Sequence, residues 1–195
     1  MDMKLLVTGF CAFGGNAENP TEALLRLLPG QVAGCELHTL LLPVEFARAG
    51  RLLTEEIDRL CPDAVLSLGL AASREAISVE RAALNLIDAR IPDNAGAQPV
   101  DAPVVPGAPA AYFATVDPRP VAAAIERSGF PAALSASAGL YVCNAVYYAC
   151  LHHAATHNHA YYALFIHVPP RPAEELVRPI CAAIDAIIRG ISRNA

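Results

Sequence analysis

The chain has 195 residues, of which 14 are basic and 19 acidic, so its formal net charge is −5 and its pI is near 5.6. Hydrophobic residues make up 54% and charged residues only 17%, which excludes a largely disordered chain. The acidic balance argues against a nucleic-acid partner, and no apolar run reaches the roughly 18 residues that a membrane span requires. A chain of this length is expected to form one domain over residues 1–195.

The amino-terminal half alternates short apolar runs with helical patterns. Residues 4–8 predict a strand, which a glycine-rich turn at 9–15 closes, and Asn19-Pro20 predicts the capped start of a helix over 21–28. The next predicted elements are a strand at 35–42, a helix at 45–60, and strands at 64–68 and 79–87. Residues 88–111 contain five prolines and predict a long loop, a feature that usually has a function in a compact domain.

The carboxy-terminal half continues the alternation and is unusually apolar. The predicted elements are a helix at 120–128, a strand at 132–135, a buried helix at 144–157, a strand at 161–168 and an amphipathic helix at 173–193. From Ser128 to Pro170 there is no acidic or basic residue, which is typical of the middle of a core. The alternation predicts the α/β class, with a mostly parallel central sheet covered on both faces.

The six cysteines do not form a disulfide or zinc pattern. They are Cys11, Cys35, Cys61, Cys143, Cys150 and Cys181, and no two of them form a C-x-x-C pair. The amino terminus lacks the features of a secretion signal, so we expect a cytoplasmic protein whose cysteines are mostly small buried hydrophobes.

Three side chains are candidates for nucleophilic catalysis. Cys143 stands just before a predicted helix, whose free N–H groups favour a thiolate, although a buried core cysteine is the commoner case. His167 ends a predicted strand and could act as the base, or could be a satisfied core histidine. Glu80 lies in an apolar setting and needs a partner, either an imidazole or an ion pair with Arg81 or Arg90.

Two further patterns are weaker. His152, His153, His157 and His159 form a cluster, but no acidic residue is near it in sequence and a helix C-terminus favours histidine anyway, so we expect no metal. Phe13-Gly14-Gly15 does not have the spacing of a phosphate-binding loop, and we expect the turn to display Phe10 and Phe13 as apolar walls of a pocket.

A set of co-linear segments spans residues 7–169. The segments are Val7-Thr-Gly-Phe10, Phe13-Gly-Gly15, Asn19-Pro20-Thr21, Leu42-Pro-Val44, Val79-Glu80-Arg81, Asn85, Asp88-Ala-Arg-Ile-Pro-Asp-Asn94, Pro109-Ala-Ala-Tyr-Phe113, Ala138-Gly139, Val142-Cys143-Asn144 and Phe165-Ile-His-Val-Pro169. In this order they resemble the pyroglutamyl peptidase type I (pyrrolidone-carboxylate peptidase) family of cytosolic cysteine peptidases.

The resemblance implies a fold, an activity and a set of site residues. The fold is a single catalytic domain, a three-layer α/β/α sandwich that commonly forms homotetramers and uses no cofactor. The activity is that of an omega peptidase, a thiol protease that removes an N-terminal pyroglutamyl residue from peptides through an acyl-enzyme. The nucleophile falls on Cys143, the base on His167 and the acid on Glu80, with Arg90 near the oxyanion. The substrate pocket falls on Phe10, Phe13, Leu70, Tyr141 and Val142.

The sequence departs from the family pattern at a few pocket positions, which keeps other functions open. Leu70 stands where many bacterial members carry Gln, Tyr141 replaces a Phe, and Cys11-Ala12 replaces a bulkier pair. One alternative is therefore a binding protein that retains the pocket but has lost catalysis. Another is a nucleoside phosphorylase-like enzyme, which rests on fold analogy alone and lacks a phosphate site in the sequence.

Overall fold

Strands and helices alternate along the chain, as the sequence predicts. The computed structural model describes residues 3–15, 18–157 and 160–193. The strands are β1 (Lys4–Phe10), β2 (Gln31–Val32), β3 (Cys35–Leu42), β4 (Ala64–Leu70), β5 (Ile77–Glu80), β6 (Ala82–Leu84), β7 (Ala111–Phe113), β8 (Ala132–Ser135) and β9 (Tyr162–Val168). The helices are α1 (Pro20–Leu27), α2 (Ala49–Leu60), α3 (Pro118–Arg127), α4 (Val142–Thr156) and α5 (Ala173–Ser192).

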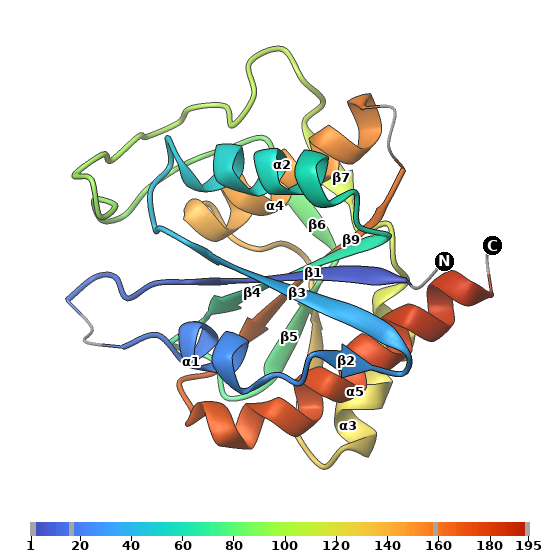
Figure 1. The fold of residues 1–195 in the computed structure, drawn as a ribbon. Helices are drawn as coiled ribbons and strands as arrows, with labels where there is room; N and C mark the ends of the chain where they lie inside the picture. Colours follow the sequence, from blue (N-terminus) through green and yellow to red (C-terminus); the bar gives the residue numbers. More distant parts are fainter. Residues whose placement is uncertain (1–2, 16–17, 158–159, 194–195) are drawn as a thin grey trace.

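The central sheet is mixed but mostly parallel. Its strand order is β2-β3-β1-β4-β9-β5-β8, and β3, β1, β4 and β9 run parallel to one another. β5 is antiparallel to β9, and β8 follows the direction of β5. The carboxyl ends of β1, β4 and β9 therefore meet at one edge of the sheet, the left side of Figure 1. In open α/β sheets, ligands bind at this edge.

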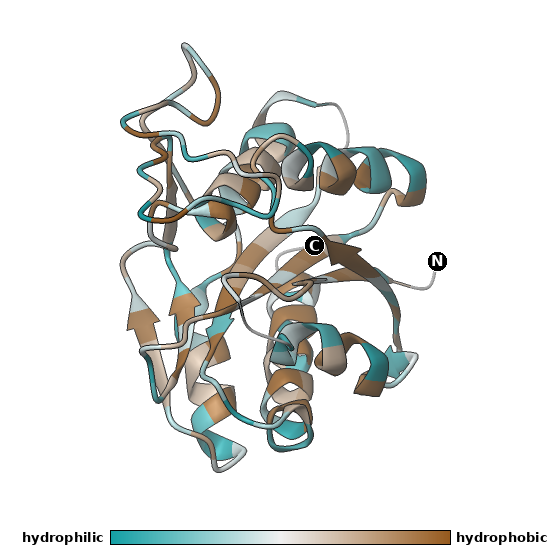
Figure 2. Ribbon diagram, turned by 90° about the vertical axis from the view of Figure 1, so that its left-hand side faces the viewer, coloured by the Kyte–Doolittle hydropathy of each residue, from teal (hydrophilic) through white to brown (hydrophobic). Residues whose placement is uncertain are grey.

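Two layers of helices enclose the sheet, which confirms the three-layer α/β/α sandwich (Figure 1). Helices α1, α3 and α5 pack on one face and bury a core that includes Leu24, Val121 and Ile180. Helices α2 and α4 cover the other face, over a core that includes Leu53 and Val146. Figure 2 shows the hydrophobic strands between helices whose outer faces are hydrophilic.

Helix α4 is the most enclosed helix. It lies against α2 on one side and contacts β6, β7 and β9 on others, so that most of its residues are buried. Tyr147 and Tyr148 are almost fully buried, and their hydroxyls donate to the carbonyls of Glu80 and Pro109, at 3.5 and 2.5 Å. The absence of charged residues from this helix follows from that burial. In the part of the chain that the structure describes, no helix combines the length and the apolar run needed to cross a membrane.

Several predicted boundaries need correction. The strands predicted at 35–42 and 132–135 are confirmed. The single strand predicted at 79–87 is wrong: β5 ends at Glu80, and β6 leaves the central sheet to pair with β7 in a separate two-stranded sheet. β7 and β2 were not predicted at all. Helix α2 begins at Ala49 rather than at residue 45, and α4 begins at Val142, two residues earlier than predicted.

Candidate active site

His167 and Glu80 form a buried pair on the face of the sheet that α4 covers. In the β5–β9 register Ser78 lies opposite His167 and Glu80 opposite Phe165, so His167 and Glu80 are diagonal neighbours on one face. Nδ1 of His167 lies 2.7 Å from Oε1 of Glu80, and the side chains are 7% and 0% exposed. Because a carboxylate only accepts, Nδ1 donates this hydrogen bond and Nε2 keeps a lone pair free to accept a proton.

Cys143 lies close to this pair, in the first turn of α4, the helix that covers this face of the sheet. A β-carbon placed on Gly69 would lie 2.9 Å from Sγ of Cys143 and 2.8 Å from the ring of Phe165. Gly69 pairs with His167 in the β4–β9 register, so the thiol lies over the strand position adjacent to the imidazole. The structure therefore brings together Cys143, His167 and Glu80, which the sequence separates by up to 87 positions.

The surroundings of Cys143 favour the neutral thiol over the thiolate. Burial raises its pKa from the ordinary 9.0 to about 12, and the nearby Glu80 carboxylate acts in the same direction. The backbone N–H at the helix start lowers the pKa, as predicted, but burial outweighs it. The sulfur therefore needs a base to become a nucleophile.

The charge partner of Glu80 is Arg74, which sequence reasoning did not single out. Nη1 of Arg74 donates to Oε1 of Glu80 at 2.7 Å, and Nη2 lies 3.4 Å from Oγ of Ser135. The alternative of an ion pair between Glu80 and Arg81 or Arg90 is not what the structure shows, because the arginine that meets Glu80 is Arg74. Arg81 follows Glu80 directly in an extended segment and is exposed, and Arg90 is exposed on the long loop. Oε2 of Glu80 is buried with no hydrogen-bond partner among the described residues.

The predicted pocket residues divide between three places. Phe13 and Tyr141 face each other with ring centroids 6.2 Å apart, and Tyr141 also meets Phe46 edge to face at 5.3 Å. Phe10 is only 2% exposed and belongs to the core beneath them. Val142 lines the cleft between α2 and α4, whereas Leu70 lines a hollow on the opposite face beside the starts of α1 and α5.

The loop over residues 85–110 forms a wall of the site, and a few polar side chains hold it in place. Asp93 accepts from the backbone N–H groups of Phe46, Ala95 and Ala97 at 2.8–2.9 Å. The hydroxyl of Tyr141 donates to the carbonyl of Pro92 at 2.9 Å. Asp93 fell within a matched segment, but nothing in the sequence indicated its contacts.

Asn144, directly after Cys143, anchors the first turn of α4. Its amide donates to the carbonyls of Leu84 and Leu86 and accepts from the N–H of Leu84, at 2.9–3.0 Å. The side chain is fully buried, so these bonds fix the turn that carries the thiol against the segment around β6. An asparagine inside an apolar, uncharged stretch was the sequence signal that could have identified it, because a polar side chain there needs hydrogen-bond partners.

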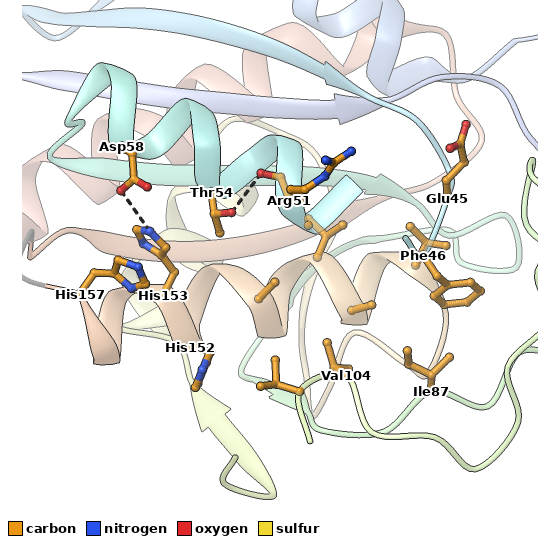
Figure 3. A pocket seen from close by; sticks show the side chains of 16 residues that line it. Glu45, Phe46, Arg51, Thr54, Asp58, Ile87, Val104, His152, His153 and His157 are labelled. Carbon is orange, nitrogen blue, oxygen red and sulfur yellow. Dashed lines mark hydrogen bonds and ion pairs between the residues drawn. The ribbon is translucent and has the colours of Figure 1, made fainter. Parts of the chain in front are cut away.

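The histidines gather at a separate cavity, between α2 and α4 (Figure 3). His153 pairs with Asp58 at 3.2 Å and with the Tyr161 hydroxyl at 3.1 Å, and its ring stacks on His157. His159, the last member of the predicted cluster, lies outside the described residues. Within residues 3–15, 18–157 and 160–193, no group of three or more potential ligands could hold a metal ion.

Comparisons with known proteins agree over nearly the whole chain. A family model described as pyroglutamyl peptidase matches residues 3–192. The pyrrolidone-carboxylate peptidase of Pyrococcus furiosus is 46% identical over 173 residues, which cover 88% of this chain and 83% of that protein. The Levilactobacillus brevis protein of the same name is 41% identical over 95% of this chain and 98% of that protein. The structure of pyrrolidone carboxyl peptidase from Thermococcus litoralis superimposes with a TM-score of 0.94 at 34% identity, covering 99% and 96%.

Proposed function

Since this chain belongs to the pyroglutamyl peptidase family and is a cysteine omega peptidase, we propose that it removes N-terminal pyroglutamyl residues from peptides with a Cys143–His167–Glu80 triad. The observation that carries the proposal is the 2.7 Å contact between His167 Nδ1 and Glu80 Oε1, with the Cys143 sulfur over the neighbouring strand. This order of groups gives a nucleophile, a base and a group that orients the base.

The first chemical step couples proton transfer to attack. His167 takes the proton of the neutral Cys143 thiol at Nε2 while the sulfur attacks the carbonyl carbon that follows the lactam ring. Glu80 holds Nδ1–H in place and stabilises the imidazolium that forms. The imidazolium then gives its proton to the nitrogen of the leaving peptide as the C–N bond breaks. Water, deprotonated by the same imidazole, hydrolyses the thioester and returns the enzyme to its starting state.

The start of α4 supplies the donors for the oxyanion. Cys143 is the second residue of the helix, so its backbone N–H has no acceptor within the helix. One such donor aimed at the developing oxyanion stabilises the transition state by about 3–4 kcal/mol. Arg90, exposed on the loop that carries Ile91, is the second donor in this proposal.

The lactam ring is a compact, uncharged group with one N–H and one ring carbonyl. Phe13 and Tyr141 offer apolar faces for it, and Phe10 lies in the core beneath them. Polar groups that bind the ring carbonyl would be left without a partner by proline, which lacks that oxygen. We therefore expect prolyl substrates to be rejected strongly.

Two properties of the assembled protein complete the proposal. All six cysteines are free thiols, which suits a reducing compartment, so we place the enzyme in the cytoplasm. Phe113 and Val100 are 71% and 65% exposed, which supports the homo-oligomer, a tetramer, that the family resemblance implies. Sedimentation velocity measures that assembly directly.

The test is hydrolysis of a pyroglutamyl-chromophore amide against its prolyl analogue, before and after treatment with iodoacetamide. Cys61 is exposed and would react as well, so a Cys61→Ser background makes the alkylation report on the remaining thiols. We expect selective release that alkylation abolishes, and no release by Cys143→Ala. An active Cys143→Ala enzyme would refute the triad. Thermal stabilisation by pyroglutamate without any release would instead support the binding protein that has lost catalysis.

A further inference from the structure

The Glu80–His167 pair has a third charged member, and its position suggests a role in the reaction. Arg74 and His167 both donate to the same oxygen of Glu80, Oε1, each at 2.7 Å. We propose that Arg74 is a positioning residue for the triad: it fixes the Glu80 carboxylate toward His167 and, as a cation, allows the triad to release its proton at neutral pH. This inference rests on the proposed function, since it concerns the same site.

The first support is the burial of the carboxylate. Glu80 is 0% exposed, and its other oxygen, Oε2, has no hydrogen-bond partner among the described residues. A buried carboxylate is costly unless a charge pairs with it and hydrogen bonds satisfy it. His167 is neutral for part of the reaction cycle, so Arg74 is the permanent countercharge in this contact. Its guanidinium cannot lose its proton in a protein.

The second support is the way in which Arg74 is held. The turn that carries it is bonded to the end of β9, because Ala71 N–H donates to the carbonyl of Val168 and Arg74 N–H donates to that of Ala71. The other arm of the guanidinium reaches Ser135 Oγ on β8 at 3.4 Å. Arg74 thus bridges the strand that carries His167 and the strand beside Glu80. Because both its backbone and its guanidinium are held, Arg74 can keep the Glu80 carboxylate in one orientation and does more than place a positive charge nearby.

The third support is the charge balance around the imidazole. The titratable groups around the Glu80–His167 pair include Arg74 from the turn after β4, which donates to the Glu80 carboxylate, and Tyr147 and Cys143 from α4, which meet the Glu80 carbonyl and feel the Glu80 charge, respectively. Catalysis requires the coupled thiol and imidazole to have lost one proton to solvent before the substrate binds. Removing the Arg74 cation makes that loss harder, whichever of the two groups gives up the proton. The acid limb of the pH–rate profile must then move to higher pH.

The experiment compares Arg74→Met and Arg74→Lys with a matched control, Arg81→Met, which removes an exposed cation that follows Glu80 directly. For Arg74→Met we expect kcat to fall about 10- to 100-fold, the equivalent of one charged hydrogen bond. We expect KM to change by less than about threefold, because Arg74 acts through Glu80 and not on the substrate. The acid limb should move up by about one pH unit. Arg74→Lys should return the acid limb to its wild-type pH, and Arg81→Met should have the kcat and the acid limb of the wild type.

Two additional readouts separate this inference from a purely structural role and from the proposed function. The rate of Cys143 alkylation against pH, in the Cys61→Ser background, needs no substrate and should show the same shift. Guanidinium ion at millimolar concentration should rescue Arg74→Ala, since the Arg74 side chain is 34% exposed and the vacated position is open to solvent. If the wild type does not hydrolyse the pyroglutamyl amide, the proposed function fails while the alkylation profile still tests Arg74.

Other outcomes overturn the inference alone. A folded Arg74→Met enzyme with wild-type kcat and an unmoved acid limb would show that Arg74 has no part in the reaction. If Arg74→Met lowers activity only in proportion to its unfolded fraction, the role is structural and the inference is wrong. If Arg74→Met does not fold, Arg74→Lys and Arg74→Gln provide the comparison. Acid limbs at the same pH in the pH–rate profiles of these two variants would contradict the role of the cation.

Discussion

Gly69 leaves the space that the Cys143 sulfur occupies, so Gly69→Ala should move the nucleophile. The added methyl would lie 2.9 Å from Sγ and 2.8 Å from Cζ of Phe165. Because nonbonded atoms pack at about 3.5–4.0 Å, the sulfur and the ring edge must each move by about 0.5–1 Å. The backbone cannot yield easily, since Gly69 is buried in β4, the strand between β1 and β9, and pairs with His167 of β9.

Two effects follow from that displacement, with different sizes. Overpacking a well-filled core typically costs about 1–3 kcal/mol of the free energy of unfolding. A misplacement of about 1 Å in a reacting group costs on the order of 100-fold in rate. We therefore expect kcat/KM for the pyroglutamyl amide to fall about 100-fold in a protein that is still folded. The alkylation rate of Cys143 should fall as well, because the sulfur no longer lies over the strand beside His167.

The assay needs controls that separate crowding from loss of geometry. Gly50→Ala also crowds a helix contact, with the new methyl 3.1 Å from Cβ of Ala149, but it does so between α2 and α4. Gly190→Ala adds a methyl with nothing within 4 Å. Gly50→Ala should lower the melting temperature and keep its kcat/KM. Gly190→Ala should also keep its kcat/KM, without lowering the melting temperature, because alanine is the better helix former. A folded Gly69→Ala enzyme with wild-type kcat/KM and alkylation rate would refute the placement of the thiol.

Three further predictions concern residues around the site. Asn144→Ala should cost about 3 kcal/mol in the free energy of unfolding, since it removes three hydrogen bonds to partly buried backbone groups of Leu84 and Leu86; urea denaturation measures this. Asp93→Asn should raise KM several-fold with little change in kcat, because it loosens the loop and not the triad; equal KM values would contradict this. The pKa of His153 is lowered below its ordinary 6.5 by burial and by His157, so the unfolded chain binds a proton more readily than the folded one. Stability should therefore fall as pH drops below about 6.5, and His153→Gln should flatten this slope in denaturation curves at several pH values.

The sequence predicted those features that depend on neighbouring residues, such as helix caps and the ends of strands. The Asn19 side chain caps α1 by accepting from Thr21 N–H at 3.1 Å, as the Asn-Pro pair predicted. The positions of Cys143 at a helix start and of His167 near a strand end followed in the same way from an apolar run and the turn residues beside it. A buried acid that needed a partner was also correctly recognised in Glu80.

The partners could not be predicted, because they depend on which strands become neighbours. The turn at residues 71–76 has no distinctive pattern, yet it brings Arg74 to Glu80 because β5 pairs with β9 rather than with β4. The split of residues 79–87 into β5 and β6 likewise depends on β7, about 30 residues further along the chain. Arg81 was the nearer cation in sequence, but a strand directs successive side chains to opposite faces.

The antiparallel direction of β5 explains how Glu80 and Cys143, the proposed acid and nucleophile, can both reach the imidazole of His167. In open α/β sheets the reactive groups usually lie just past the carboxyl ends of the parallel strands, but Glu80 lies within the sheet. Because β5 runs against β9, Glu80 lies opposite Phe165, two residues inside the sheet from His167. The carboxylate therefore reaches Nδ1 from the interior, fully buried, and Nε2 is left for the thiol at the start of α4. A carboxylate in that position needs a permanent countercharge, and Arg74 provides it from a turn that remains partly open to solvent.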